Sequence, residues 1–145
     1  MLSFLGASSG IGRELAKELV RLCPNVYLVL SSRRENELHA FAQELQLDST
    51  RYLVLPLDLE NHGIGFVSKV NLVLNKFGRI DILINNGGIS QRSLIKDTVS
   101  KVDVRLININ YLGTVTLSKA VLQVLIRLRL VRIYFHFIQY LLAFH

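Results

Sequence analysis

Short apolar runs alternate with longer amphipathic segments along most of the chain. Within the segments, apolar residues recur at helical spacing, which is typical of helices that bury one face. The apolar runs are predicted to be strands, and they cover 2–5, 26–31, 52–57 and 80–84. Helices are predicted between them, with apolar faces that include Leu15, Leu38 and Val67. A further helix is expected from about Ser100 to Ile126.

This alternation predicts the fold class. Single helices between successive strands are typical of βαβ crossovers, which build a parallel sheet with helices on both faces. The expected fold is therefore α/β, a three-layer sandwich of a parallel sheet with helices on both faces. With 145 residues, the chain has the length of one domain. We divide it into a half-domain at 1–122 and a divergent basic and apolar tail at 123–145.

Charge and cysteine content exclude some functions. Residues 1–103 carry 12 basic and 11 acidic residues, so nearly all of the net charge of +6 belongs to the last third of the chain. No basic stripe interleaved with aromatic residues precedes Arg127, and no nucleic-acid partner is expected. Cys23 is the only cysteine, which excludes an internal disulfide. No Cys/His cluster has metal-ligand spacing, so no metal site is expected.

The segment GASSGIG at 6–12 matches two patterns with different chemistry. G-x-S-x-G would make Ser8 the nucleophile of an α/β hydrolase. Gly6, Gly10 and Gly12 instead fit a turn that receives a phosphate at a helix N-terminus. The hydrolase oxyanion hole needs a loop after an earlier strand, and only five residues precede Gly6. The phosphate-binding turn is therefore favoured, with Gly12 allowing close packing of helix and strand.

Four motifs, in this order, resemble the short-chain dehydrogenase/reductase family of Rossmann-fold oxidoreductases. GASSGIG resembles the glycine turn of the family, and LDL at 57–59 its acidic residue after the third strand. NNGG at 85–88 resembles its NNAG motif, and NYLG at 110–113 its N-x-x-G helix. Within the family, NNGGISQRS and NYLGTVTLSKAVL resemble the member 7 subgroup. The resemblance fades after Leu122, which implies a Rossmann-like fold truncated after the fourth strand and its following helix.

The resemblance implies a Rossmann-like parallel sheet with strand order 3-2-1-4 and a nicotinamide dinucleotide as cofactor. It also implies hydride transfer to or from a carbonyl or alcohol, with a small lipophilic substrate such as a steroid or retinoid. The implied cofactor-binding residues are Gly6, Ser8, Ser9, Gly10, Ile11, Gly12, Arg33, Arg34, Asp58, Leu59, Asn85 and Gly87. Asn110 takes the position of the asparagine whose kinked backbone holds a water in the proton relay of the family.

Some of these positions have an alternative, purely structural interpretation. Asp58 can be a cap or turn residue, and Asn85 and Asn86 can tie neighbouring backbone groups in a turn. Gly87 replaces the usual alanine of the family. Leu5 stands where the family usually has a threonine, and this change is expected to loosen the glycine loop.

The end of the second strand bears on the choice of cofactor. Ser31-Ser32-Arg33-Arg34 stands where members that prefer NAD place an acid against the ribose 2′-hydroxyl. An acid would repel a 2′-phosphate, whereas an arginine can bind it through charge-assisted hydrogen bonds. NADP(H) is therefore predicted over NAD(H). The alternative is that both arginines are solvated first-turn residues of the next helix.

The 145 residues contain no counterpart of the catalytic tyrosine and lysine of the family. No tyrosine is followed by a lysine four positions later, and the family's fifth-strand serine has no match. The chain alone is therefore predicted to be inactive. A non-catalytic nucleotide-binding or interaction module is the alternative function.

Residues 123–145 contain no glycine, proline or acid. We expect them to be mobile or to extend the helix rather than to form a fifth strand. The open edge of the fourth strand would then promote self-association or lipid binding. An interfacial membrane helix, with Arg127, Arg129 and Arg132 at its polar edge, is an alternative. Met1 begins the first strand, so no signal peptide or anchor is expected, although related proteins often associate with the endoplasmic reticulum membrane.

Overall fold

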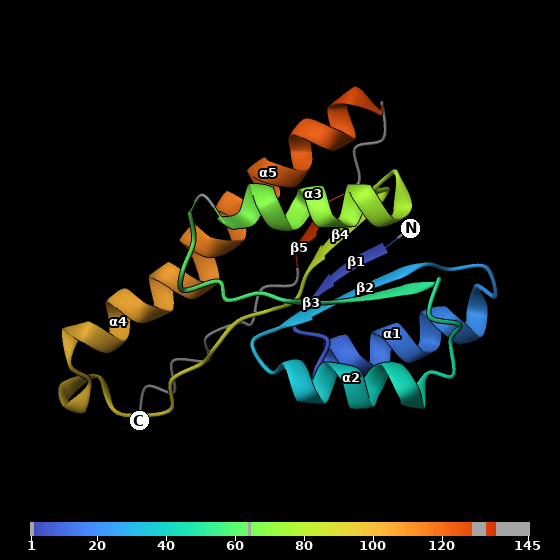
Figure 1. The fold of residues 1–145 in the computed structure, drawn as a ribbon. Coiled ribbons are helices and arrows are strands. Elements are labelled where there is room, and N and C mark those ends of the chain that lie inside the picture. Colours follow the sequence, from blue (N-terminus) through green and yellow to red (C-terminus); the bar gives the residue numbers. More distant parts are fainter. Residues whose placement is uncertain (1, 64, 129–132, 136–145) are drawn as a thin grey trace.

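The computed structural model describes residues 2–63, 65–128 and 133–135, which build one parallel sheet (Figure 1). The strands lie in the spatial order β3-β2-β1-β4-β5, and every neighbouring pair is parallel. Their bounds are β1 Leu2–Leu5, β2 Leu28–Ser32, β3 Tyr52–Pro56, β4 Ile82–Asn85 and β5 Ile133–Phe135. The order of the first four strands confirms the one predicted.

Helices cover both faces of the sheet, which confirms the α/β three-layer fold (Figure 1). One face carries α1 (Gly10–Leu22) and α2 (Glu35–Glu44), and the other carries α3 (Gly65–Phe77) and α5 (Thr114–Arg127). A 3₁₀ turn, η1 (Ile95–Asp97), leads into α4 (Ser100–Ile107) and the π-helical segment η2 (Asn108–Gly113). The helical stretch 100–127 could cross a membrane by length and composition alone. In this fold its second half packs against the sheet and α3.

Two hydrophobic cores lie on opposite faces of the sheet. Leu28 and Leu30 point into the core beneath α1 and α2, whereas Val29 points into the core beneath α3 and α5. All three side chains are fully buried. Successive side chains of a strand point to opposite faces, so a strand covered on both sides is apolar at every position. This explains the continuous apolar run in the sequence.

Glu44 joins the two helices on the first face. Its carboxylate pairs with Arg13 and with Lys17 of α1, the latter at 2.9 Å between Nζ and Oε1. The guanidinium of Arg13 also lies 4.5 Å from the ring centroid of Phe41 in α2. The hydrogen bond from Lys17 holds the pKa of Glu44 below its ordinary value. These contacts fix α1, and the glycine loop that precedes it, against α2.

The fifth strand corrects the prediction for the tail. Ile133–Phe135 pairs with β4 from Leu83↔Ile133 to Asn85↔Phe135, so the sheet does not end at its fourth strand and the edge of β4 is covered. Ile133 packs against the core that contains Leu83. The prediction relied on the absence of glycine and proline after the long helix, but common turns accept most residue types. Pairing with β4 satisfies backbone groups that an open edge would leave exposed.

Of the remaining predictions for the tail, the structure bears on the helix extension only. α5 continues through Leu122 to Arg127, as the helix-extension alternative expected for those residues. The division into 1–122 and 123–145 stays a prediction. Residues 129–132 and 136–145, on which the mobile-tail and membrane-helix predictions depend, lie outside the described residues.

Candidate functional site

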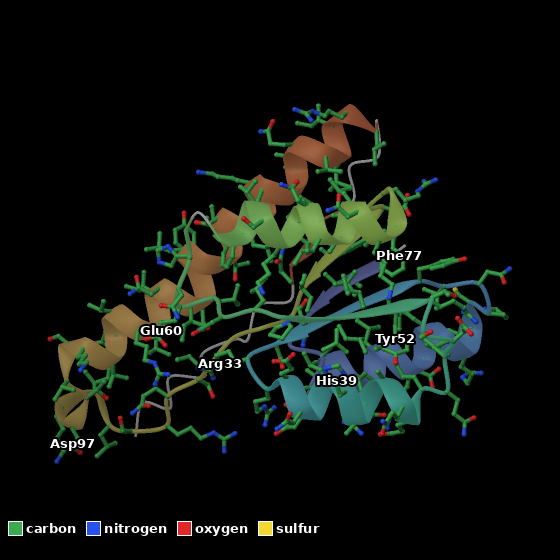
Figure 2. The ribbon with its side chains drawn as sticks, viewed as in Figure 1. Arg33, His39, Tyr52, Glu60, Phe77 and Asp97 are labelled. Carbon is green, nitrogen blue, oxygen red and sulfur yellow. The ribbon has the colours of Figure 1, made fainter. Side chains whose placement is uncertain are left out.

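A cavity of about 300 Å³ opens at the carboxyl ends of the strands. Its walls are the glycine loop after β1, the segments that follow β2 and β3, and the loop after β4. The chain order of the strands reverses between β1 and β4, and open α/β sheets bind ligands at such a switch point. Figure 2 shows Arg33 at this end of the sheet, with Tyr52 and Phe77 at the opposite end.

Most of the cofactor residues expected from the sequence line this cavity. They are Gly6, Ser8, Ser9, Gly10, Ile11, Arg33, Arg34, Asp58, Leu59 and Gly87. The lining also includes residues that were not among the implied cofactor-binding residues, namely Ser31, Ser32, Leu57, Asn86, Gly88, Ile89 and Ile109. All but Ile109 lie within the motifs quoted above, and Ile109 directly precedes NYLG, so their place in or beside a motif was the available signal. Gly12, Asn85 and Asn110 are absent from the lining.

The glycine loop has the backbone that its sequence requires. Gly6 has φ +72° and Gly10 has φ +58°, in the left-handed region that favours glycine. A Cβ at Gly12 would overlap the carbonyl oxygen of Gly6 and the side chain of Asn86. Gly12 therefore supports the cavity from behind by letting α1 approach the loop.

The N-terminus of α1 points its backbone N–H groups toward the loop. Ser9, the N-cap, makes no side-chain capping hydrogen bond, and the first turn of α1 carries no acid. The first N–H groups of a helix lack intrahelical partners and lie at the positive end of its dipole. This end of α1 can therefore receive an anionic group such as a phosphate.

Arg34 bridges the start of α2 and the glycine loop. Its Nη2 donates hydrogen bonds to Ser8 Oγ at 3.0 Å and to Ser9 Oγ at 2.7 Å. Its Nη1 lies 3.1 Å from Glu37 Oε1, and its backbone N–H donates to Ser32 Oγ at 3.0 Å. A guanidinium thus lies at the wall of the cavity beside two hydroxyl groups, where it can bind an oxyanion. Arg33, also in the wall, is exposed.

Asp58 is the centre of a turn as well as part of the cavity wall. Its Oδ1 accepts a hydrogen bond from the backbone N–H of Glu60, and its Oδ2 accepts one from Asn61 Nδ2, both at 3.0 Å. A carboxylate that accepts a hydrogen bond from the backbone two residues later forms an Asx turn. The turn interpretation of Asp58 is therefore observed in the structure, beside its position in the wall.

Asn85 ties β4 to α5 behind the cavity. Its side chain is 2% exposed, and Nδ2 donates to Ser118 Oγ at 3.0 Å. Ser118 in turn donates to the carbonyl oxygen of Thr114 at 2.8 Å. This buried chain of hydrogen bonds fixes the carboxyl end of β4, and its partner is a side chain of α5, not the neighbouring turn backbone that the structural interpretation of Asn85 expected.

Asn110 fixes the loop after β4 through a pair of hydrogen bonds to Ile89. Its Oδ1 accepts from the Ile89 N–H and its Nδ2 donates to the Ile89 carbonyl, both at 2.8 Å. Asn110 lies in the π-helical segment η2, a distortion that is frequent at functional sites. One turn later, a Cβ at Gly113 would overlap the backbone of Leu59. The N-x-x-G motif therefore brings η2 close to two walls of the cavity.

Comparison with known proteins identifies the family. The sequence pattern of the short chain dehydrogenase family matches residues 3–133, which extends past Leu122, where the resemblance was expected to fade. Human dehydrogenase/reductase SDR family member 7 is 52% identical over 121 residues, which cover 81% of this chain and 35% of that protein. The chain thus spans about a third of the length of this relative.

Two solved structures share the fold. A glucose/ribitol dehydrogenase of the short-chain family from Brucella melitensis has a TM-score of 0.77 and 30% identity, over 85% of this chain and 51% of that one. An alcohol dehydrogenase from Thermococcus sibiricus, complexed with 5-hydroxy-NADP, has a TM-score of 0.77 and 28% identity, over 87% of this chain and 53% of that one. Together with the match to residues 3–133, these likenesses show that the chain belongs to the short-chain dehydrogenase/reductase family.

Proposed function

We propose that this chain forms the dinucleotide-binding part of an NADP(H)-dependent oxidoreductase. The whole protein would transfer hydride between a nicotinamide and a carbonyl or alcohol group, and its substrate would be a small lipophilic compound such as a steroid or retinoid. The chain alone is proposed to bind the cofactor without turnover, because its 145 residues include no Tyr-x-x-x-Lys sequence.

The groups around the cavity support the proposal of a dinucleotide ligand. Gly12 lets α1 pack closely behind the glycine turn, because a Cβ there would overlap the carbonyl oxygen of Gly6, and the N-terminus of α1 offers N–H groups to a pyrophosphate. Arg33 and Arg34 would hold the adenosine end, beside Asp58. The nicotinamide supplies the hydride chemistry when it is bound.

The preference for NADP(H) rests on the contact between Arg34 and the two serines of the glycine loop. The carboxyl end of β2 carries Ser31 and Ser32 instead of an acid, so no carboxylate at the strand end repels a 2′-phosphate. Arg34 already lies against Ser8 and Ser9, which limits the side-chain entropy lost when a phosphate binds. The complex of the Thermococcus relative with an NADP derivative is consistent with this preference.

Calorimetric titration of the chain with NADP and with NAD tests the proposal. Charged hydrogen bonds contribute about 1.5–3 kcal/mol each, so NADP should bind at least about tenfold more tightly than NAD. Equal affinities would contradict the NADP preference. The absence of binding by both dinucleotides would contradict the proposed site itself.

Two further expectations remain proposals. Self-association was predicted from an open edge of β4, and β5 removes that reason without testing the oligomeric state. Contact of the tail with a membrane surface depends on residues outside the described part of the chain.

A further inference from the structure

Asn86 and Gly87 form the only Asn-Gly pair in the sequence. They lie directly after β4, in the wall of the cavity. In such a pair the backbone nitrogen of the second residue can attack the side-chain amide of the first. A glycine in the second position favours this reaction because it has no Cβ to hinder the approach and because its backbone is mobile.

The structure leaves the reacting groups outside the regular hydrogen bonding of the sheet. β4 ends at Asn85 and its pairing with β1 ends at Ile84. Within the part of the chain that the structure describes, neither the backbone N–H of Gly87 nor the side-chain amide of Asn86 makes a hydrogen bond. No such bond has to break before the nitrogen approaches the amide.

We propose that Asn86 is a site of spontaneous deamidation that slowly inactivates the dinucleotide site. The Gly87 nitrogen forms a bond to Asn86 Cγ while the bond from Cγ to Nδ2 breaks. Ammonia leaves with the proton that the Gly87 nitrogen loses, and a cyclic succinimide remains. Water then opens the ring at one of its two carbonyl groups, giving aspartate or isoaspartate. No oxidant or reductant takes part.

The product places a negative charge against the glycine loop. Asn86 Nδ2 lies 3.1 Å from the position that a Cβ of Gly6 would take, and it also borders Gly12. A carboxylate at this position would compete with a pyrophosphate for the N–H groups of α1 and would repel it. Because NADP and NAD share the pyrophosphate, both should lose affinity. A bound dinucleotide should in turn stabilise the loop and slow the reaction. This consequence rests on the proposed function, whereas the deamidation itself does not.

The test is to incubate the chain at 37 °C and mildly alkaline pH and to follow each asparagine by peptide mapping that resolves isoaspartate. Asn61, which is exposed and precedes His62, is the internal control. Gly87→Ala is the matched variant, because it adds only the Cβ that hinders attack, and it should slow the reaction at residue 86 by about tenfold. An excess of NADP should slow it in the unmodified chain. Asn86→Asp should bind NADP, NAD and ADP more weakly by a similar factor.

Each outcome decides one step. The modification site is overturned if Asn86 deamidates no faster than Asn61. It is also overturned if Asn86 deamidates at the same rate in Gly87→Ala as in the unmodified chain. Should Gly87→Ala fail to fold, the comparison with Asn61 in the unmodified chain decides this step. If a folded Asn86→Asp variant binds dinucleotides as tightly as the unmodified chain, the proposed inactivation is overturned. If the unmodified chain binds no dinucleotide while Asn86 deamidates, the proposed function fails and the modification site stands.

Discussion

Arg34 and Ser9 lie 25 positions apart in the sequence and meet through a hydrogen bond of 2.7 Å from Nη2 to Oγ. The bond connects the start of α2 to the glycine loop and thereby joins two motifs that the sequence presents separately. The guanidinium of Arg34 is permanently charged, so the cavity wall has a fixed cation beside the turn that is proposed to hold phosphate.

Arg34→Ala should weaken the binding of NADP by about tenfold or more, with a much smaller effect on NAD, because Arg34 is proposed to bind the 2′-phosphate that NAD lacks. Arg33→Asp should reverse the preference in favour of NAD. Arg21→Ala, which removes an exposed arginine in the last turn of α1, is the control and should leave both affinities unchanged. Calorimetric titrations of the three variants with NADP and with NAD measure these affinities. An Arg33→Asp variant that still prefers NADP would refute the role of this segment.

Gly113→Ala should destabilise the fold by about 1–3 kcal/mol, because its Cβ has no space against the backbone of Leu59. Gly65→Ala is the matched control: no atom lies within 4 Å of the position of its Cβ, and the free energy of unfolding should stay equal or rise slightly. Urea denaturation followed by circular dichroism measures both. Equal stability of the two variants would contradict the close approach of η2 to Leu59.

Local patterns in the sequence predicted the strands, whereas the strand order and most of the cavity wall were implied by the resemblance to the family. A buried strand is recognised by its run of apolar residues, and the glycine turn is recognised by the spacing of its glycines. β5 was missed because no glycine or proline after the long helix marks a turn back toward β4, which lies about fifty residues earlier in the chain. The contact of Asn110 with Ile89 was missed for the same reason, since two motifs had to be placed side by side before their amide groups could be paired.

Ser118→Ala should destabilise the chain by about 1–3 kcal/mol, because it leaves the buried Nδ2 of Asn85 without its acceptor. Ser68→Ala, on the exposed side of α3, is the control and should be neutral or slightly stabilising. A double-mutant cycle with Asn85→Ala isolates the pair. Strict additivity of the two substitutions would show that the hydrogen bond does not couple β4 to α5.

The pH dependence of stability should include a contribution from Glu44. The hydrogen bond from Lys17 lowers the pKa of Glu44 in the folded chain, so its stabilising effect is present above the ordinary glutamate pKa and is lost as the pH falls through the folded-state value. The urea midpoint of Glu44→Gln should therefore lie below that of the unmodified chain at pH 7, and the difference should shrink on acidification. Glu18→Gln, whose partner Arg21 lies on the same helix, is the control. A difference that grows toward acid pH would contradict the assignment.

The most direct test of the account is to map the amide signals of the isotopically labelled chain during titration with NADP. A dinucleotide in the cavity predicts that the largest shifts fall on 6–12, 31–34, 57–59 and 86–89, the segments that form its wall or support it. It also predicts that NAD causes weaker shifts at 31–34 than NADP does. Saturable binding whose shifts fall outside these segments, or no saturable shifts at all, would contradict the assignment of this cavity as the dinucleotide site.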